Sequence, residues 1–150
     1  MRVEERLAEL GIELPEPVKP AANYVRYLRT GNLLFISGTG PSDSAPKGKV
    51  GTEVTPEEAY QAAREVGLQI LATAREALDG DLNRITRAVK VLGMVNSAPD
   101  FEGQPQVING CSDLLVEVLG EKGRHTRSAV GFAALPNRIC VEIEATFEVE

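Results

Sequence analysis

Arg127 is the residue of this sequence best suited to bind a small anion. It follows Lys122, Arg124 and His125 in an otherwise acidic chain, where a strand is expected to begin. Those three residues are typical of a solvated charged loop, the more common role of such a cluster. Small side chains follow Arg127 on the same strand face, namely Ala129, Gly131 and Ala133. Because they cannot cover its guanidinium, whose planar donors suit a carboxylate, the sequence predicts an anion site at Arg127.

A second candidate for chemistry is the pair Glu142 and Glu144 in the last expected strand. Their spacing puts both carboxyl groups on one face of the strand, about 7 Å apart. Such a pair could work as an acid and a base, but alternation of polar and apolar residues also produces an ordinary solvated face. His125 could carry a proton near neutral pH, although a lone histidine in a charged loop is usually only solvated. Both interpretations stay open for these residues.

Motifs for other kinds of chemistry are missing from the sequence. Gly38 and Gly40 form a GxG pair, but the third glycine of a dinucleotide fingerprint does not follow. Ser37 lacks the G-x-S-x-G surroundings of a hydrolase nucleophile. The two cysteines, Cys111 and Cys140, have no metal-ligand spacing, and no other residues show it either. We therefore expect neither a cofactor nor a metal.

Length, composition and charge narrow the class of protein. The chain of 150 residues is 43% hydrophobic and 25% charged, as expected for one folded domain. Its net charge of -6 argues against nucleic acid as a partner, since affinity for phosphates comes largely from Lys and Arg. The charged first ten residues cannot form a secretory signal, and no apolar run approaches the length of a membrane span. A cytoplasmic protein that does not contact membranes is the simplest expectation.

The elements that must position these residues follow from the pattern of apolar residues. Residues 1–20 are expected to form a short helix and a proline-rich connector, in front of a domain of residues 21–150. Strand-like and helical patterns then alternate in the order β-β-α-β-α-β-β, over residues 23–29, 33–37, 55–78, 87–96, 106–119, 127–134 and 138–149. The class is α+β, a sheet with two helices on one face. We expect the small residues that follow Arg127 to face another subunit.

The sequence resembles the RidA/YjgF family of reactive-intermediate deaminases. It is most similar to a less characterised branch of that family. Three segments carry the resemblance most clearly, residues 127–130 (RSAV), 135–136 (LP) and 141–145 (VEIEA). Tyr24-Val25 and the run from Leu34 to Gly38 agree with it, so the similarity covers about residues 23–149. The resemblance implies a chorismate-mutase-like α+β fold and a barrel-like homotrimer with clefts between subunits.

The resemblance also implies an activity and roles for residues. Members of the family hydrolyse enamines and imines to 2-oxo acids and ammonia without a cofactor. Arg127 would clamp the substrate carboxylate, and Glu142, expected on the neighbouring strand, would position the attacking water. The other cleft positions would be Tyr24, Ser37, Gly38, Asn109 and Ala129, the last of which replaces a cysteine common in the family.

Two other functions remain open from the sequence. A non-catalytic trimer could bind a 2-oxo acid or a similar metabolite as a sensor or scavenger. An RNA-cleaving or translation-inhibiting role is attached to some relatives, but the acidic charge counts against it.

Overall fold

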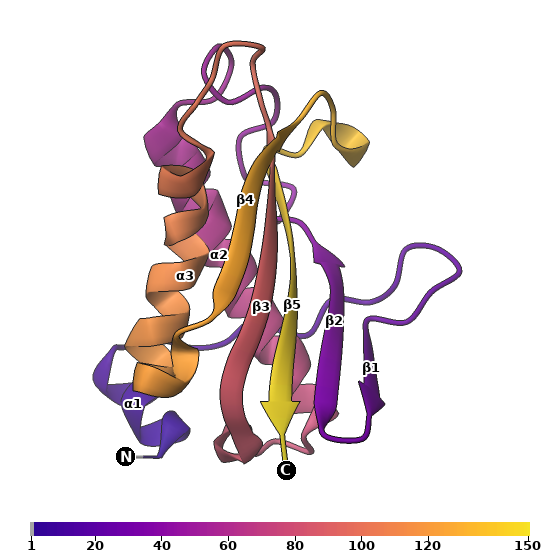
Figure 1. Cartoon of the computed structure of the whole chain (residues 1–150), viewed down its shortest axis with the longest axis vertical. Coiled ribbons are helices and arrows are strands. Elements are labelled where there is room, and N and C mark those ends of the chain that lie inside the picture. Colours follow the sequence, from indigo (N-terminus) through magenta and orange to yellow (C-terminus); the bar gives the residue numbers. More distant parts are fainter. Residues whose placement is uncertain (1) are drawn as a thin grey trace.

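A five-stranded mixed sheet with three helices makes up the chain in the computed structural model, which describes residues 2–150 (Figure 1). The helices are α1 (Val3–Glu9), α2 (Pro56–Ala77) and α3 (Gln104–Leu119). The strands are β1 (Tyr27–Thr30), β2 (Leu33–Thr39), β3 (Ile85–Asn96), β4 (Thr126–Phe132) and β5 (Val141–Val149). The predicted α+β class and the order of elements after residue 21 are confirmed, although the first strand begins at Tyr27 rather than at residue 23.

The strands lie in the order β1-β2-β5-β3-β4 across the sheet. Only β3 and β4 are parallel, whereas the other neighbouring strands are antiparallel. The expectation that Arg127 and Glu142 lie on neighbouring strands is therefore wrong, because β3 lies between β4 and β5. The reason is the β3-α3-β4 crossover, which returns the chain parallel to β3 on its outer side and leaves the inner side for β5.

The helices α2 and α3 pack side by side on one face of the sheet, as predicted (Figure 1). The start of α2 is set by a capping box, in which Thr55 Oγ1 accepts a hydrogen bond from Glu58 N and Glu58 Oε1 accepts one from Thr55 N. Behind this cap, the apolar residues of α2 and α3 face the sheet and each other in one core. The capping box and the 3.6-residue repeat are local features, so the sequence could predict this helix.

Within residues 2–150, no α-helix packs on the opposite face of the sheet. In β5 the odd-numbered residues from Val141 to Val149 are buried, whereas the even-numbered residues project from the other face. Three large apolar side chains of that outer face are about two-fifths exposed, namely Phe35 at 42% and Val130 and Phe132 at 40% each. The predicted division of β5 into a core face and an acidic face is confirmed.

The small residues of β4 lie on the side of the sheet where α3 packs. Ala129 packs against the core, and a Cβ atom at Gly131 would lie 2.8 Å from Gln104 Nε2 and from Ser97 Oγ. Gly131 and Ala133 are exposed in the single chain, so our expectation that this face meets another subunit stays a prediction. The crossover places α3 over the same face of β3 and β4, so the small side chains allow a helix of the same chain to approach.

The N-terminal helix α1 packs against the rest of the chain. Val3 and Leu7 belong to the single apolar core. Val3 N donates a hydrogen bond to Asn83 Oδ1 at 2.9 Å, and Arg6 Nε donates one to the carbonyl of Glu117 in α3 at 2.8 Å. The helix expected at the N-terminus is confirmed, whereas a boundary between two units at residue 20 stays a prediction.

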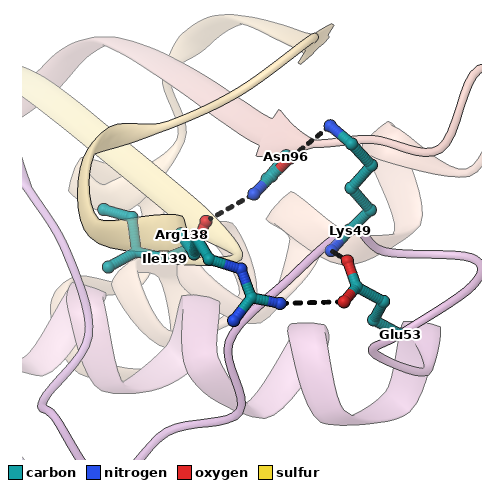
Figure 2. Close-up of polar contacts among 5 residues, drawn as sticks. All are labelled: Lys49, Glu53, Asn96, Arg138 and Ile139. Atoms are coloured by element: carbon teal, nitrogen blue, oxygen red, sulfur yellow. Dashed lines mark hydrogen bonds and ion pairs between the residues drawn. The ribbon is translucent and has the colours of Figure 1, made fainter.

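Asn96, at the end of β3, joins two loops at one end of the sheet (Figure 2). Its Oδ1 accepts a hydrogen bond from Lys49 Nζ at 3.3 Å, and its Nδ2 donates one to the carbonyl of Ile139 at 3.2 Å. Beside it, Arg138 and Glu53 form an ion pair at 2.8 Å. Asn96 is only 4% exposed, so its side-chain bonds are shielded from water.

We expect Asn96→Ala to lower the free energy of unfolding by about 1–3 kcal/mol, because the carbonyl of half-buried Ile139 loses its side-chain donor. Urea denaturation followed by circular dichroism measures the change. Glu121→Ala is the control, since it removes only the exposed Arg124–Glu121 pair and should change stability by less than about 0.5 kcal/mol. Equal effects of the two substitutions would show that Asn96 does not hold the loops.

Candidate functional site

Arg127 of β4 is held by α3 rather than projecting into solvent. Its Nη1 donates hydrogen bonds to Asn109 Oδ1 at 2.8 Å and to Ser112 Oγ at 3.1 Å. Its Nη2 donates one to the carbonyl of Pro105 at 3.2 Å. These contacts fix the plane of the guanidinium, so the arginine is oriented before any ligand binds.

The same arginine keeps donors for a ligand. Within residues 2–150, hydrogen bonds engage three of its five N–H groups, which leaves the Nε–H and one Nη2–H. These two groups lie on the same edge of the guanidinium, the arrangement that binds both oxygens of a carboxylate. A surface hollow of about 290 Å³ lies beside them, lined by residues that include Asn109, Ser112 and Arg127.

His125 and Ser112 continue this polar cluster. Ser112 Oγ lies 2.8 Å from His125 Nε2, and His125 Nδ1 lies 2.6 Å from the carbonyl oxygen of Gly123. The ring is half-buried, and burial lowers the pKa of His125, opposed by the Gly123 carbonyl and helped by the charge of Arg127. His125 is therefore an ordered part of the site and not the solvated loop residue that we considered the common case.

Glu142 of β5 forms a second cluster with Gly38 and Arg26. A Cβ atom at Gly38 would overlap Glu142 Oε2, so only glycine leaves room for this carboxylate. Burial raises the pKa of Glu142, the charge of Glu144 raises it further, and Arg26 opposes the shift. A carboxyl group that holds its proton more readily than usual can act as an acid as well as a base.

Arg26 organises the residues around Glu142. Its guanidinium is buried and donates to the carbonyl of Gly38 at 3.0 Å, to Thr39 Oγ1 at 2.5 Å and to Tyr24 Oη at 3.3 Å. The predicted site residues Tyr24, Ser37 and Gly38 therefore lie in one region, around Arg26. Ser37 contributes its carbonyl at 3.4 Å from Arg26 Nη2, while its hydroxyl donates to the carbonyl of Val25 at 2.6 Å.

We expect Glu142→Gln to raise the melting temperature at pH 7, because the ionised carboxylate is the form that burial disfavours. A raised pKa in the folded state means that wild-type stability falls as pH rises through the range above about 4.5. The difference between variant and wild type should therefore shrink as the pH is lowered to about 4. Scanning calorimetry across this range measures it, with Glu121→Gln as an exposed control. A less stable variant at pH 7 would mean that a cation stabilises the carboxylate.

The two clusters lie on opposite faces of the sheet within one chain. Arg127 is aligned with Val91 of β3, which is buried under the helices, whereas Glu142 is aligned with Met94, which projects from the outer face. Aligned residues of paired strands project to the same face. The predicted site residues thus fall into a helix-side group of Asn109, Arg127 and Ala129 and a second group of Tyr24, Ser37, Gly38 and Glu142.

Comparison with known families decides the identity of this arrangement. Residues 4–144 match a family model described as "YjgF/chorismate_mutase-like, putative endoribonuclease". This range takes in nearly the whole sheet, both helices of the core and both clusters of predicted site residues. The chain belongs to the YjgF family. The resemblance predicted from the sequence is confirmed, and with it the chorismate-mutase-like fold.

Individual YjgF-like relatives are similar to this chain along almost its whole length. Protein TCP17 of Trypanosoma cruzi is 43% identical over 99% of this chain and 94% of its own length. The crystal structure of a protein of unknown function from Agrobacterium tumefaciens is 46% identical, covers 99% of this chain and 92% of its own, and has a TM-score of 0.91. A "putative endoribonuclease" from Shewanella oneidensis is 31% identical with a TM-score of 0.94, covering 99% of this chain and all of its own.

Ser112 and Arg26 were missed from the YjgF-like sequence, and His125 was considered as a proton carrier but not placed beside Arg127. Ser112 follows Asn109 by one helical turn on α3, and His125 precedes Arg127 by two residues, so both spacings could have indicated a shared location. No sequence feature indicated a role for Arg26, because a single arginine after an irregular segment is ordinarily exposed. Their roles depend on how α3 and β2 are placed.

The described part of this YjgF-family chain offers no metal centre. Among residues 2–150, no cluster of three His, Cys, Asp or Glu side chains could hold an ion. Cys111 and Cys140 are free and buried, and burial raises the pKa of the Cys111 thiol to about 12, so this thiol stays protonated near neutral pH. The same residues include no helix with the length and hydropathy of a membrane span.

Proposed function

We propose that this protein hydrolyses reactive enamines and imines of small carboxylic acids to 2-oxo acids and ammonia. Arg127 binds the substrate carboxylate, and Glu142 positions the water that attacks the imine carbon. The reaction makes modest demands on a catalyst, because an imine carbon is already electrophilic and needs mainly a fixed substrate and a placed water.

The observation that carries the proposal is the oriented guanidinium of Arg127. Two of its donors remain free beside an open hollow, and α3 supplies the bonds that hold it. A carboxylate bound there gains two charge-assisted hydrogen bonds without reorganising the protein. A reactive group next to that carboxylate would then lie in the hollow that Asn109 and Ser112 help to line.

A site that uses both Arg127 and Glu142 requires more than one copy of the chain. The two residues project from opposite faces of one sheet, and β3 separates their strands. The outer face, from which Glu142 projects, also exposes Phe35, Val130 and Phe132, an apolar surface that a second copy could cover. We propose the homotrimer implied by the resemblance, with each site formed at a junction of two subunits. Sedimentation equilibrium should give three times the chain mass, and a monomer would rule out this form of the site.

Imine decay is the direct test of the activity. An amino-acid oxidase releases the short-lived imine in the assay, and semicarbazide traps whatever imine persists. We expect the wild-type protein to reduce the trapped imine and to raise the rate at which free 2-oxo acid forms. An unchanged decay rate in the presence of the protein would overturn the proposed function. Binding of a 2-oxo acid without turnover would favour the non-catalytic sensor or scavenger instead.

RNA cleavage is a second candidate, because the family description and the Shewanella oneidensis relative both carry the name endoribonuclease. The net charge of -6 works against it, since few cations are available to neutralise a phosphate backbone. Cleavage of a labelled RNA by the wild type, weakened by added salt and lost in Arg127→Ala, would favour this function over deamination.

A further inference from the structure

A chain of hydrogen bonds runs from Arg127 through Ser112 and His125 to the carbonyl of Gly123. The chemistry of the groups fixes the direction of each bond. The carbonyl can only accept, so His125 Nδ1 carries a proton and donates at 2.6 Å. In the neutral ring Nε2 is then an acceptor, so the Ser112 hydroxyl donates to it at 2.8 Å. Arg127 can only donate, and its Nη1 donates a hydrogen bond to a lone pair of Ser112 Oγ at 3.1 Å.

We propose that Ser112 and His125 are a proton relay for the reaction at Arg127, a role that rests on the proposed deamination. As water adds to the carbon of the protonated imine, the π electrons of the C=N bond move to nitrogen. The water gives up a proton to Ser112 Oγ while Ser112 passes its own proton to His125 Nε2. The relay then returns a proton to the nitrogen, the C–N bond breaks, and ammonia leaves. The hydroxyl loses its proton to solvent as the 2-oxo acid forms.

The position of Ser112 suits this role. Its hydroxyl lies 3.1 Å from Arg127 Nη1, and Ser112, His125 and Arg127 all line one hollow. In a 2-imino acid the reacting carbon is bonded directly to the carboxylate carbon. A substrate that binds Arg127 through its carboxylate therefore keeps its reacting carbon in the hollow that Ser112 also lines, where the hydroxyl can exchange a proton.

The relay needs a neutral histidine at the pH of the reaction. Burial and the charge of Arg127 lower the pKa of His125, so the ring is neutral at pH 7 and can accept a proton. The other charged groups around the hollow are Asp113 on α3, which accepts a bond from Tyr60 Oη, and Arg124, which pairs with Glu121. Since protonation of His125 would block the relay, the rate should fall as pH drops below about 6.5.

The test compares Ser112→Ala, Ser112→Thr and His125→Gln with the wild type, and Lys122→Ala is the exposed control in the same loop. Saturated imine-hydrolysis rates are measured between about pH 5 and 8, and pyruvate binding is measured by calorimetry. We expect Ser112→Ala and His125→Gln to lower the rate about 100-fold and to lose the acidic limb. Ser112→Thr, which keeps the hydroxyl, should restore both. Pyruvate affinity should fall far less in these variants than in Arg127→Ala, because the bonds from Arg127 to Asn109 and to the Pro105 carbonyl remain.

Nitrogen NMR gives a readout that does not depend on turnover. His125 is the only histidine in the sequence, so the imidazole nitrogen signals need no assignment to a residue. At pH 7 we expect the Nδ1–H tautomer, with Nε2 as the acceptor. The Nε2–H tautomer would overturn the relay, because Ser112 would then have no acceptor for its proton.

The kinetic outcomes separate the relay from the function on which it rests. If the wild type hydrolyses imines and Ser112→Ala keeps the rate and the acidic limb, the relay is wrong and the deaminase stands. If Ser112→Ala loses pyruvate binding as completely as Arg127→Ala, Ser112 only holds the arginine, and the relay is again wrong. If the wild type does not hasten imine hydrolysis, both proposals fail together.

Discussion

Arg127→Ala should lower the second-order rate constant for imine hydrolysis by about 10³-fold, with little change in the fold. The substitution removes the two free donors proposed to hold the carboxylate. Each charge-assisted hydrogen bond of this kind contributes about 1.5–3 kcal/mol, so two of them contribute about 3–6 kcal/mol, a range that includes the roughly 4 kcal/mol of a thousandfold change in rate. The rate is measured in the oxidase-coupled assay, and pyruvate affinity, which should fall in parallel, by calorimetry.

Two further variants distinguish the effect of the planar pair of donors of Arg127 from the effect of its positive charge. Arg127→Lys keeps one positive charge but has no planar pair of donors, so it should recover only a small part of the lost rate. Lys122→Ala removes an exposed charge from the same basic segment and should leave the rate unchanged. If Lys122→Ala is as damaging as Arg127→Ala, the general charge of the segment acts on the substrate, and the specific site at Arg127 is wrong.

Gly110→Ala should destabilise the protein by about 3 kcal/mol or more, a large effect for adding one methyl group to a packed core. Gly110 lies on α3 where this helix meets α2, and a Cβ atom there would overlap the carbonyl oxygen of Tyr60. The same atom would lie 3.0 Å from the backbone nitrogen of Arg64, one turn further along α2. Both obstacles are backbone, so the helices must separate to make room. The midpoint of thermal unfolding should fall by about 10 °C.

Gly67→Ala is the matched control for this prediction. It places a methyl group on α2 at the same helix–helix contact, where a Cβ atom would lie 2.8 Å from Leu114 Cδ2. That atom is the end of a side chain that can turn, and alanine favours the helix over glycine by about 1 kcal/mol. We expect a much smaller loss for Gly67→Ala. Equal losses for the two variants would contradict close backbone packing at Gly110.

The elements of the fold were largely predictable because their determinants are local in the sequence. The capping box of Thr55 and Glu58 begins α2 where it was expected. The alternation from Val141 to Val149 identified both faces of β5 correctly. The turn at Gly31, with a φ of 57°, joins the predicted hairpin. Each of these features depends on residues that are close together in the chain.

Pairs of residues that are distant in the sequence were predicted less well. The sequence alone indicated the importance of Arg127 and Glu142, through residue chemistry and the family resemblance. It placed them on neighbouring strands, whereas β3 lies between their strands and the two side chains project to opposite faces. Strand order depends on the crossover through α3, which no local pattern of residues specifies.

By itself, then, the sequence determined the family, the order of the elements and the inward faces of α2, α3 and β5, since these follow from side-chain type and period. Only the tertiary structure decided which side chains meet. It brought Ser112 and His125 to Arg127, and Arg26 to the surroundings of Glu142. The physical reason is that hydrogen bonds between segments depend on the packing of α3 over β4 and of β2 beside β5. That packing results from the whole core and not from any one stretch of residues.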